Sequence, residues 1–436
     1  MKKISNTLFK HYLQNKIIEL LPKNWNKKPY KEILDYIINL FNTHNLGKNY
    51  YGYHNIDHEL EVSYITMLIG TSKKINQQDL KYLYIASLLH DFDPIKIIDK
   101  PHEESVIKFL EFDKKLKEII NEFKLSFDII KVLILRTTYP WEGKLKKKSE
   151  KKINAIFNVL NDKKYDKDHI MEIGWYLSVI DRISGYAIGN FNKSMDIAKK
   201  NAHSLTWHPS LIVRNTIIYF ENLFNIESYM CNYVLNLLPT TLQKNFLNNI
   251  FKFMKLRQQE IKIKSNYLYN NMSFVSKIEQ NNNRTNTKFI KTLLSIYVEL
   301  PKPLQINKND FIKSIKDENV ILTTLRLKNR TGKIIGFAKG GPIENYSFKQ
   351  KVNDENYGLK NTIFLEPIAL KMGYWGLHGG RMMRHVFTSQ ARDKKFKFLA
   401  SFALRNVIKK RIKNKEEIKF VKLFNPERWD YYRIKL

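Results

Sequence analysis

The chain has 436 residues, of which 43% are hydrophobic and 13% aromatic, which is enough for two or three domains with apolar cores. No run reaches the roughly 18 consecutive apolar residues of a membrane helix, and the first residues lack the apolar segment of a signal peptide. Cys231 is the only cysteine, which excludes an intrachain disulfide and a cysteine-based zinc cluster. These features favour a reducing, cytoplasmic compartment.

The net charge of +33 is the strongest anomaly of the composition. Residues 301–436 carry 30 Lys and Arg against 12 Asp and Glu, hence +18, and the first 300 residues carry the remaining +15. A positive field attracts polyanions such as nucleic acid, phosphorylated metabolites, a pyrophosphate cofactor or an acidic membrane surface. A basic surface without a dedicated partner explains the charge equally well, and the oligomeric state is not predicted.

Residues 1–240 have the pattern of successive helices. Apolar residues recur at three-to-four spacing in residues 31–44, 59–72, 77–91, 103–123 and 172–191. Glycine and proline fall mostly between these segments. We therefore predict an all-α domain over residues 1–240.

The pattern changes after residue 240. Residues 241–300 are predicted to be a helical, Asn- and Lys-rich connection, with a linker around 267–288. The runs "NVILTTLRLKN" and "GKIIGFAKGG", joined through "RTG", then predict a β-hairpin. Further strand-like runs, a glycine cluster and a helical run follow. Residues 301–436 are therefore predicted to form a smaller, basic α/β domain with a mixed sheet.

Side chains of the kind that bind metals occur in three helical segments. His54 and His58 are four residues apart, so on a helix they would share one face. His90 and Asp91 end an apolar helical run. Asp181 lies inside another, where an unpaired carboxylate would cost several kcal/mol. Two imidazoles and two carboxylates suit a divalent ion such as Mn²⁺, Fe²⁺, Zn²⁺ or Mg²⁺, whereas His54 alone could be a structural histidine.

The ordered set H…HD…D, which begins in "YHNIDH", resembles the HD superfamily of metal-dependent phosphohydrolases over roughly residues 45–190. The resemblance implies that His58, His90, Asp91 and Asp181 are metal ligands. It implies that His54 is the general acid on the leaving oxygen, as in phosphodiesterases, because the pKa of histidine lies near the working pH. The implied reaction is attack of a metal-bound hydroxide on a phosphate ester, such as a nucleotide or a related phosphorylated metabolite.

A second metal ion is less well supported. Phosphodiesterases carry another histidine shortly after the HD pair, and Pro94 stands in that place here. His102, Glu103 and Glu104 could substitute as ligands of a second metal or as contacts to the substrate.

Several other side chains near these motifs could contact a substrate. A phosphate could be bound by Lys96, Lys100, Arg136 and Arg182, although solvated surface charges are the alternative in so basic a chain. A base could stack on Tyr139 or Trp141, for which core packing is the alternative.

The glycine cluster in "LEPIALKMGYWGLHGGRMMRHVF" resembles the central motif of GNAT acyltransferases, with likeness over residues 310–436. The resemblance implies that backbone N–H groups bind the pyrophosphate of an acyl-CoA at Gly373, Gly376, Gly379 and Gly380. It also implies Glu366 as a general base and Tyr431 or Tyr432 as a general acid. The alternative use of the glycines is tight packing.

Together these patterns predict a metal-dependent phosphohydrolase or phosphodiesterase. Two alternatives stay open: an acyl-CoA-dependent N-acyltransferase with a regulatory helical domain, and a basic nucleic-acid-binding protein with a structural metal site. The sequence does not specify which phosphate ester or which metal is bound.

Overall fold

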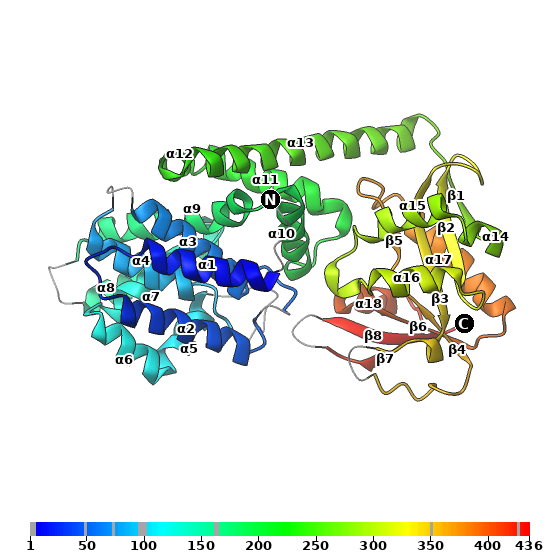
Figure 1. Cartoon of the computed structure of the whole chain (residues 1–436), viewed down its shortest axis with the longest axis horizontal. Helices are drawn as coiled ribbons and strands as arrows, with labels where there is room; N and C mark the ends of the chain where they lie inside the picture. The colour runs from blue at the N-terminus through cyan, green and yellow to red at the C-terminus, as the bar shows by residue number, and fades with distance from the viewer. Residues whose placement is uncertain are drawn as a thin grey trace. The chain divides into compact units, whose positions relative to one another are not determined.

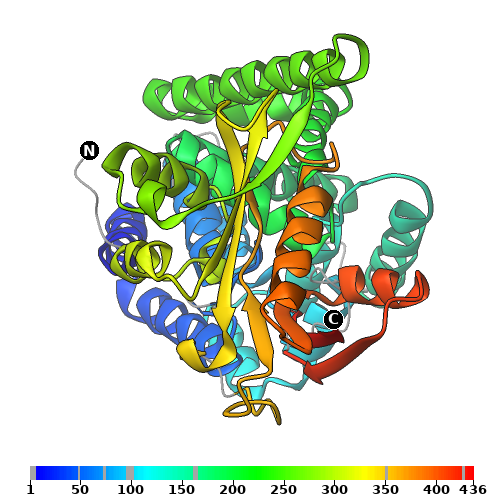
Figure 2. The same cartoon turned by 90° about the vertical axis from the view of Figure 1, so that its right-hand side faces the viewer.

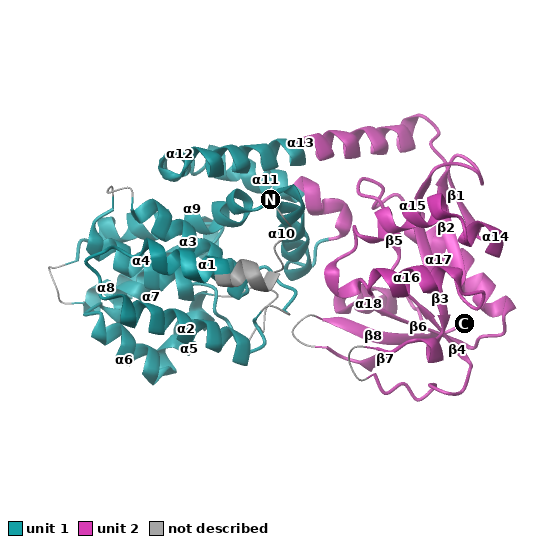
Figure 3. Ribbon diagram, in the orientation of Figure 1, with its two compact units in different colours: residues 1–207, 215–253 teal, residues 208–214, 254–436 magenta. Residues whose placement is uncertain are grey.

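The computed structural model describes residues 6–47, 50–71, 75–94, 103–160, 165–348, 352–424 and 428–436, with side chains from Tyr12 onward (Figure 1). The chain forms two compact units, residues 1–207 with 215–253 and residues 208–214 with 254–436 (Figure 3). The predicted domain limits of 1–240, 241–300 and 301–436 stay a prediction. A helical region followed by an α/β domain is confirmed.

The first unit is helical. Its elements are α1 (Asn6–Leu20), α2 (Lys27–Thr43), α3 (Ile56–Gly70), α4 (Gln77–Leu89), α5 (Glu103–Phe112), α6 (Lys114–Glu122), α7 (Phe127–Arg136), α8 (Gly143–Val159), α9 (Lys167–Ile188), α10 (Phe191–Ser204), α11 (Ile212–Asn225), α12 (Ser228–Leu237) and the first part of α13 (Thr240–Tyr269). The segment 103–123, predicted as one run, is divided because Asp113 caps α6 by accepting a hydrogen bond from the backbone of Leu116.

Three helices form the centre of the first unit. α3, α4 and α9 are buried along most of their length, including polar residues of α3. α3 packs against α4 and α9, and α7 packs against the same two helices. A buried polar side chain on these helices therefore faces protein or an internal cavity, and it needs a partner there.

The second unit is a mixed sheet with helices on both faces. The helices are α14 (Asn281–Arg284), α15 (Thr287–Tyr297), α16 (Lys308–Lys316), α17 (Gly379–Asp393) and α18 (Arg405–Lys413). The strands are β1 (Phe274–Ile278), β2 (Ile321–Leu327), β3 (Ile334–Pro342), β4 (Thr362–Leu365), β5 (Ala369–Leu370), β6 (Phe398–Leu404), β7 (Ile418–Lys422) and β8 (Trp429–Lys435). Figure 2 shows α17 in orange on one side of the sheet and α15 and α16 in yellow-green on the other.

The strands lie in the order β1-β2-β3-β4-β6-β8-β7, and β5 pairs with β3. β4 and β6 pair in parallel and are connected through α17, whereas the other pairs are antiparallel. The predicted hairpin is confirmed as β2 and β3. The predicted linker around 267–288 is corrected, because it contains β1, which pairs along its whole length with β2.

Apolar side chains cover both faces of this sheet. Met383, Phe387 and Ala391 of α17 pack on one face, and Leu293 of α15 and Phe311 of α16 pack on the other. None of the described helices is long and apolar enough to span a membrane.

Candidate metal centre

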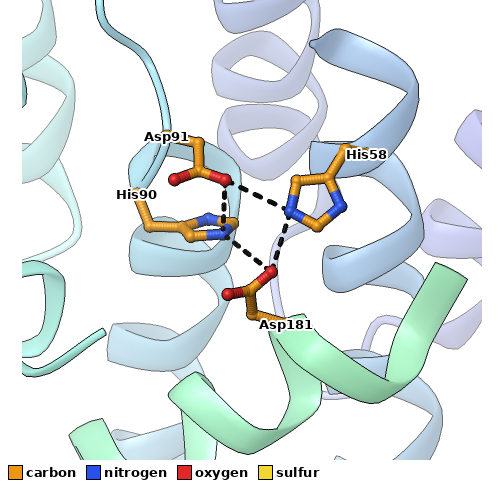
Figure 4. Close-up of side chains that lie close together, drawn as sticks. All are labelled: His58, His90, Asp91 and Asp181. Carbon is orange, nitrogen blue, oxygen red and sulfur yellow. Dashed lines mark ion pairs between the residues drawn. The ribbon is translucent and has the colours of Figure 1, made fainter. Parts of the chain in front are cut away.

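The four predicted ligands come from three central helices of the first unit. His58 lies in the first turn of α3 and Asp181 lies inside α9, while His90 and Asp91 follow the last turn of α4. Because α3 contacts both α4 and α9, the three positions meet. Figure 4 shows the four side chains turned toward a common point.

Four interatomic distances define this cluster. The Nε2 atom of His58 lies 3.2 Å from Asp91 Oδ2 and 2.9 Å from Asp181 Oδ1. The Nε2 atom of His90 lies 3.4 Å from Asp91 Oδ2 and 3.7 Å from Asp181 Oδ1. The structure thus brings one ligand atom of each residue within 4.8 Å of every other.

The same four atoms fit a divalent cation. Each is buried, and within the described part of the chain these atoms form ion pairs only with one another and with His54. Adjacent ligands at about 2.1 Å from an octahedral ion lie about 3 Å apart, and the four imidazole–carboxylate separations here run from 2.9 Å to 3.7 Å. Imidazole and carboxylate together suit Mn²⁺, Fe²⁺ or Zn²⁺. The donor set therefore has the composition and spacing of a metal site.

The charges of the cluster shift the pKa of its members strongly. Burial alone lowers the pKa of His58, but the carboxylates of Asp181 and Asp91 raise it to about 10. Burial raises the pKa of Asp181, but His58 and His90 lower it far below its usual range. Without a cation the imidazoles hold protons between the carboxylates at neutral pH. A metal ion would take the place of those protons.

Glu59 orients one of the imidazoles and was not predicted from the sequence. Its Oε2 atom lies 2.9 Å from His90 Nδ1, and both side chains are fully buried. A proton held on Nδ1 leaves Nε2 as the lone-pair atom that faces the cluster. Glu59 and Glu61 look like solvated acids in the sequence, but both are buried in α3.

His54 lies at the edge of the cluster, although not for the predicted reason. Its Nε2 atom is 3.4 Å from Asp91 Oδ2, and its side chain is 19% exposed. The side chain of Asn55 caps α3 by accepting hydrogen bonds from the first helical turn, so His54 precedes the helix. The predicted i, i+4 helical pairing with His58 is therefore wrong, but the loop still brings the two rings to a centroid distance of 6.0 Å.

A cavity of about 370 Å³ adjoins the cluster. His54, Asp91 and Asp181 belong to its wall, so two of the four ligand residues and the outer histidine face one space. Aromatic and amide side chains complete much of the wall, among them Tyr53, Tyr139, Tyr186, Tyr219, Asn215 and Asn222. The volume falls in the roughly 300–1,000 Å³ range of cavities that hold small molecules.

Of the residues predicted to bind a second metal or the substrate, some line the cavity and others do not. Glu103 lines the cavity, whereas Glu104 pairs with Lys148 at 2.9 Å and Lys152 at 2.7 Å on α8. His102 lies outside the described residues. Arg182 lines the cavity, but its guanidinium is engaged by Glu227 and by the carbonyl of Ser178.

The alternative that Arg182 and Arg136 are solvated surface charges is wrong, because both side chains are buried. Arg182 forms a two-pronged ion pair with Glu227 and donates from Nε to the carbonyl of Ser178 at 2.9 Å. Arg136 is 6% exposed, and its guanidinium carbon lies 4.2 Å from the ring centre of Trp141. Both arginines lie on helices that pack inside the unit, α9 and α7. Lys96 and Lys100 lie outside the described residues.

The four glycines of the second unit serve different purposes. Gly373 and Gly376 have φ of +91° and +82°, a left-handed conformation that favours glycine. A side chain at Gly379 would meet a leucine of β2 at 2.4 Å, so this glycine allows α17 to pack on the sheet. Gly380 follows in the first helical turn, and no side-chain hydrogen bond caps α17. Gly379 therefore serves tight packing, which was the alternative use of the glycines. The turn leaves backbone N–H groups at the start of α17.

Glu366, Tyr431 and Tyr432 are all buried. Glu366 pairs with buried Lys339 and accepts a hydrogen bond from Tyr346 at 3.0 Å.

The two tyrosines face opposite sides of β8. The Tyr431 hydroxyl donates to Asp354 at 2.9 Å, whereas the Tyr432 hydroxyl accepts from Arg411 at 2.6 Å. Their roles in acyl transfer stay a prediction.

Comparison with protein families covers the helical region that carries the cluster. Residues 55–185 match the HD domain family. This HD domain includes His58, His90, Asp91 and Asp181, and the resemblance predicted from the sequence is confirmed. Comparison with curated proteins finds no significantly similar sequence.

The C-terminal region resembles solved acetyltransferases. A GNAT-family acetyltransferase from Staphylococcus aureus shares 12% identity and a TM-score of 0.26, covering 38% of this chain and 99% of its own. A ribosomal-protein-alanine N-acetyltransferase from Brucella melitensis shares 15% identity and a TM-score of 0.27, covering 37% of this chain and 99% of its own. Similarity at this level says nothing about activity.

Proposed function

We propose that the HD domain is a metal-dependent hydrolase of a phosphate ester, with a nucleotide or a related phosphorylated metabolite as substrate. The observation that carries the proposal is the convergence of four buried ligand atoms whose ion pairs, among the described residues, are confined to one another and His54, with Asp91 and Asp181 at the wall of a cavity. Two imidazoles and two carboxylates packed without a cation are expensive to bury. The position of the two carboxylates in a cavity wall is explained if the cluster serves a ligand.

The residues of the cluster have separate roles in this proposal. His58, His90, Asp91 and Asp181 would hold the cation, and Glu59 would orient His90 through Nδ1. When bound, a divalent cation lowers the pKa of water and offsets the charge of the phosphoryl group.

His54 has the position of a proton donor. It lies beside the cluster, is partly exposed, and belongs to the cavity wall. An imidazole that carries a proton there can donate it to the leaving oxygen of an ester bound in the cavity. Asp91, at 3.4 Å, would hold the ring in place.

The test combines metal content with hydrolysis. Wild-type protein, Asp91→Ala and His54→Gln are analysed for bound metals and screened with phosphomonoesters and phosphodiesters. Asp168→Asn is the matched control, because Asp168 is an exposed acid on α9, the helix that carries Asp181. We expect Asp91→Ala to lose metal and hydrolysis, and His54→Gln to keep metal while hydrolysis falls by about 10²–10⁴-fold. Equal metal in wild type and Asp91→Ala would refute the ligand assignment.

A second candidate function belongs to the second unit, where we propose that the start of α17 binds the pyrophosphate of an acyl-CoA. The connection of parallel β4 and β6 through α17, with a left-handed glycine turn before an uncapped helix, favours it. Acetyl-CoA should raise the thermal unfolding temperature of wild type but not of Gly380→Asp, which places a carboxylate at that helix start. Equal stabilisation of both proteins would exclude this site.

A further inference from the structure

A second cavity in the first unit lies beside the one at the HD cluster. It has a volume of about 220 Å³ and is lined by aromatic rings and by one arginine that is nine-tenths buried, Arg136. Tyr139 and Asn222 belong to the walls of both cavities, so the two spaces are neighbours. The proposed hydrolysis makes no use of this second space.

Arg136 is held in the cavity wall by its surroundings rather than by an anion. Its guanidinium carbon lies 4.2 Å from the ring centre of Trp141 and 5.7 Å from that of Trp175. Its Nη1 atom is buried and has no hydrogen-bond partner in the described residues. A buried donor of a charged group without an acceptor is costly, so this arginine is arranged for a partner that the chain does not supply.

Glu227, one of the two acids of this cavity wall, is already engaged. Glu227 accepts both prongs of Arg182 and the indole N–H of Trp175 at 2.7 Å. Two buried guanidinium groups, Arg136 and Arg182, therefore lie beside one carboxylate, and the three side chains together carry one net positive charge. Glu150 also attracts Arg136, and Asp181 also attracts Arg182, but neither forms an ion pair with that arginine in the described residues. The other acid of the wall, Glu142, is exposed to solvent. Burial, together with the second arginine, lowers the pKa of Arg136 to about 10 although Glu227 opposes it.

The packing of α7 on α9 makes room for this arginine. Gly174 lies in the middle of α9, and a Cβ atom there would come within 2.6 Å of Arg136 Cβ and 2.7 Å of its Cγ. A glycine inside a helix costs about 1 kcal/mol relative to alanine. Its presence opposite Arg136 is explained by the close approach of the arginine stem.

We propose that the cavity at Arg136 is a binding subsite for a phosphoryl group. A guanidinium binds phosphate oxygens through two parallel N–H bonds, and the unpartnered Nη1 supplies such a donor. The volume is below the roughly 300–1,000 Å³ of sites that enclose a whole small molecule, so it holds one group of a ligand. Resting on the proposed function, the inference names the substrate class as a compound with two phosphoryl groups, one at the metal cluster and one at Arg136.

The binding test is independent of hydrolysis. Inorganic phosphate is titrated into the full-length, metal-free protein, and tryptophan fluorescence and calorimetry are followed. We expect binding in wild type, at least tenfold weaker binding in Arg136→Gln, an intermediate value in Arg136→Lys, and no change in Lys147→Gln, an exposed lysine of α8. The fluorescence change should be smaller in Trp141→Phe, in which Trp175 remains in the wall, while calorimetry still detects binding. Undiminished phosphate binding in Arg136→Gln, or tighter binding of acetate than of phosphate, overturns the proposal.

The kinetic test separates the two sources of the phosphoryl group. If the phosphoryl group bound at Arg136 belongs to the substrate, Arg136→Gln raises KM at least tenfold for a nucleoside 3′,5′-bisphosphate. The same variant raises KM less than twofold for the corresponding nucleoside monophosphate. If it is free phosphate, added phosphate alters hydrolysis of the monophosphate in wild type and not in Arg136→Gln. Equal KM changes for both substrates contradict the substrate arm. If wild type hydrolyses neither compound, the proposed function fails while the titration still decides the subsite.

Discussion

Replacing Glu59 by glutamine tests how the fold prepares His90 to bind a metal. The carboxylate lies 2.9 Å from His90 Nδ1, and both side chains are fully buried. Glutamine keeps the shape and one acceptor oxygen but removes the charge. The carbonyl of Ser87, 3.2 Å from the same Nδ1, still favours the proton on that nitrogen.

The expected loss of metal affinity follows from this partial replacement. Loss of a group that orients a metal-binding histidine lowers metal affinity by about 10–100-fold. Because Ser87 and the glutamine oxygen retain part of the orientation, we expect the lower end for Glu59→Gln, about tenfold in Kd or about 1.4 kcal/mol. Glu59→Ala, which also leaves a hole, should reach about a hundredfold.

The assay is competitive titration of Mn²⁺ or Zn²⁺ against a chelating dye at fixed pH. Glu61→Gln is the matched control, since Glu61 is a buried acid of the same helix that pairs with Lys193 instead of a ligand. It should leave the metal Kd within about threefold. Unchanged affinity in Glu59→Gln, or an equal loss in Glu61→Gln, would refute this reading of the cluster.

Three further predictions concern protons, packing and a buried ion pair. The carboxylates beside His58 raise its pKa to about 10, so metal affinity should rise with pH from 6 to 9 as the imidazole loses its proton more easily. Calorimetry in buffers of different ionisation enthalpy should detect release of about one to two protons per metal ion, and an affinity that does not change with pH would contradict this. Gly174→Ala should destabilise the protein to urea by about 1–3 kcal/mol despite better helix propensity, because its Cβ would lie 2.6 Å from Arg136 Cβ; stabilisation would show that the arginine stem moves freely. Lys339→Met should lower the free energy of unfolding by about 3–5 kcal/mol, because it leaves Glu366 buried without its cation. Adding Glu366→Leu should restore most of that stability, whereas a loss below about 1 kcal/mol in the single variant would show that Glu366 does not depend on Lys339 for its burial.

The ligand-type residues can be found in the sequence because each interrupts an apolar pattern. His90 and Asp91 end the apolar run of α4, and Asp181 stands inside α9, so their polarity alone marks them as candidate ligands. The strands of the second unit can be predicted for a similar reason, because β-branched and aromatic runs lie between turn residues. The short β1 cannot, because its Asn-rich flanks resemble a linker and its pairing with β2 is not local.

Other features depend on packing that no local pattern reports. Glu59 looks solvated until α3 is found to be buried along most of its length. The position of His54 depends on a competition at the helix start, where the side chain of Asn55 satisfies backbone N–H groups and α3 therefore begins only at Ile56. Arg136 looks like one of many surface cations, and its burial follows from α7 packing where α9 carries a glycine. Binding of nucleic acid, suggested by charge alone, stays a prediction.

The most direct test of the central claim is an anomalous-difference map from crystals of the full-length protein grown with Mn²⁺. We expect a peak about 2–2.5 Å from the Nε2 atoms of His58 and His90 and from a carboxylate oxygen of Asp91 and of Asp181. Well-ordered density for the four side chains with no peak among them, or a peak bound by other residues only, would contradict the account.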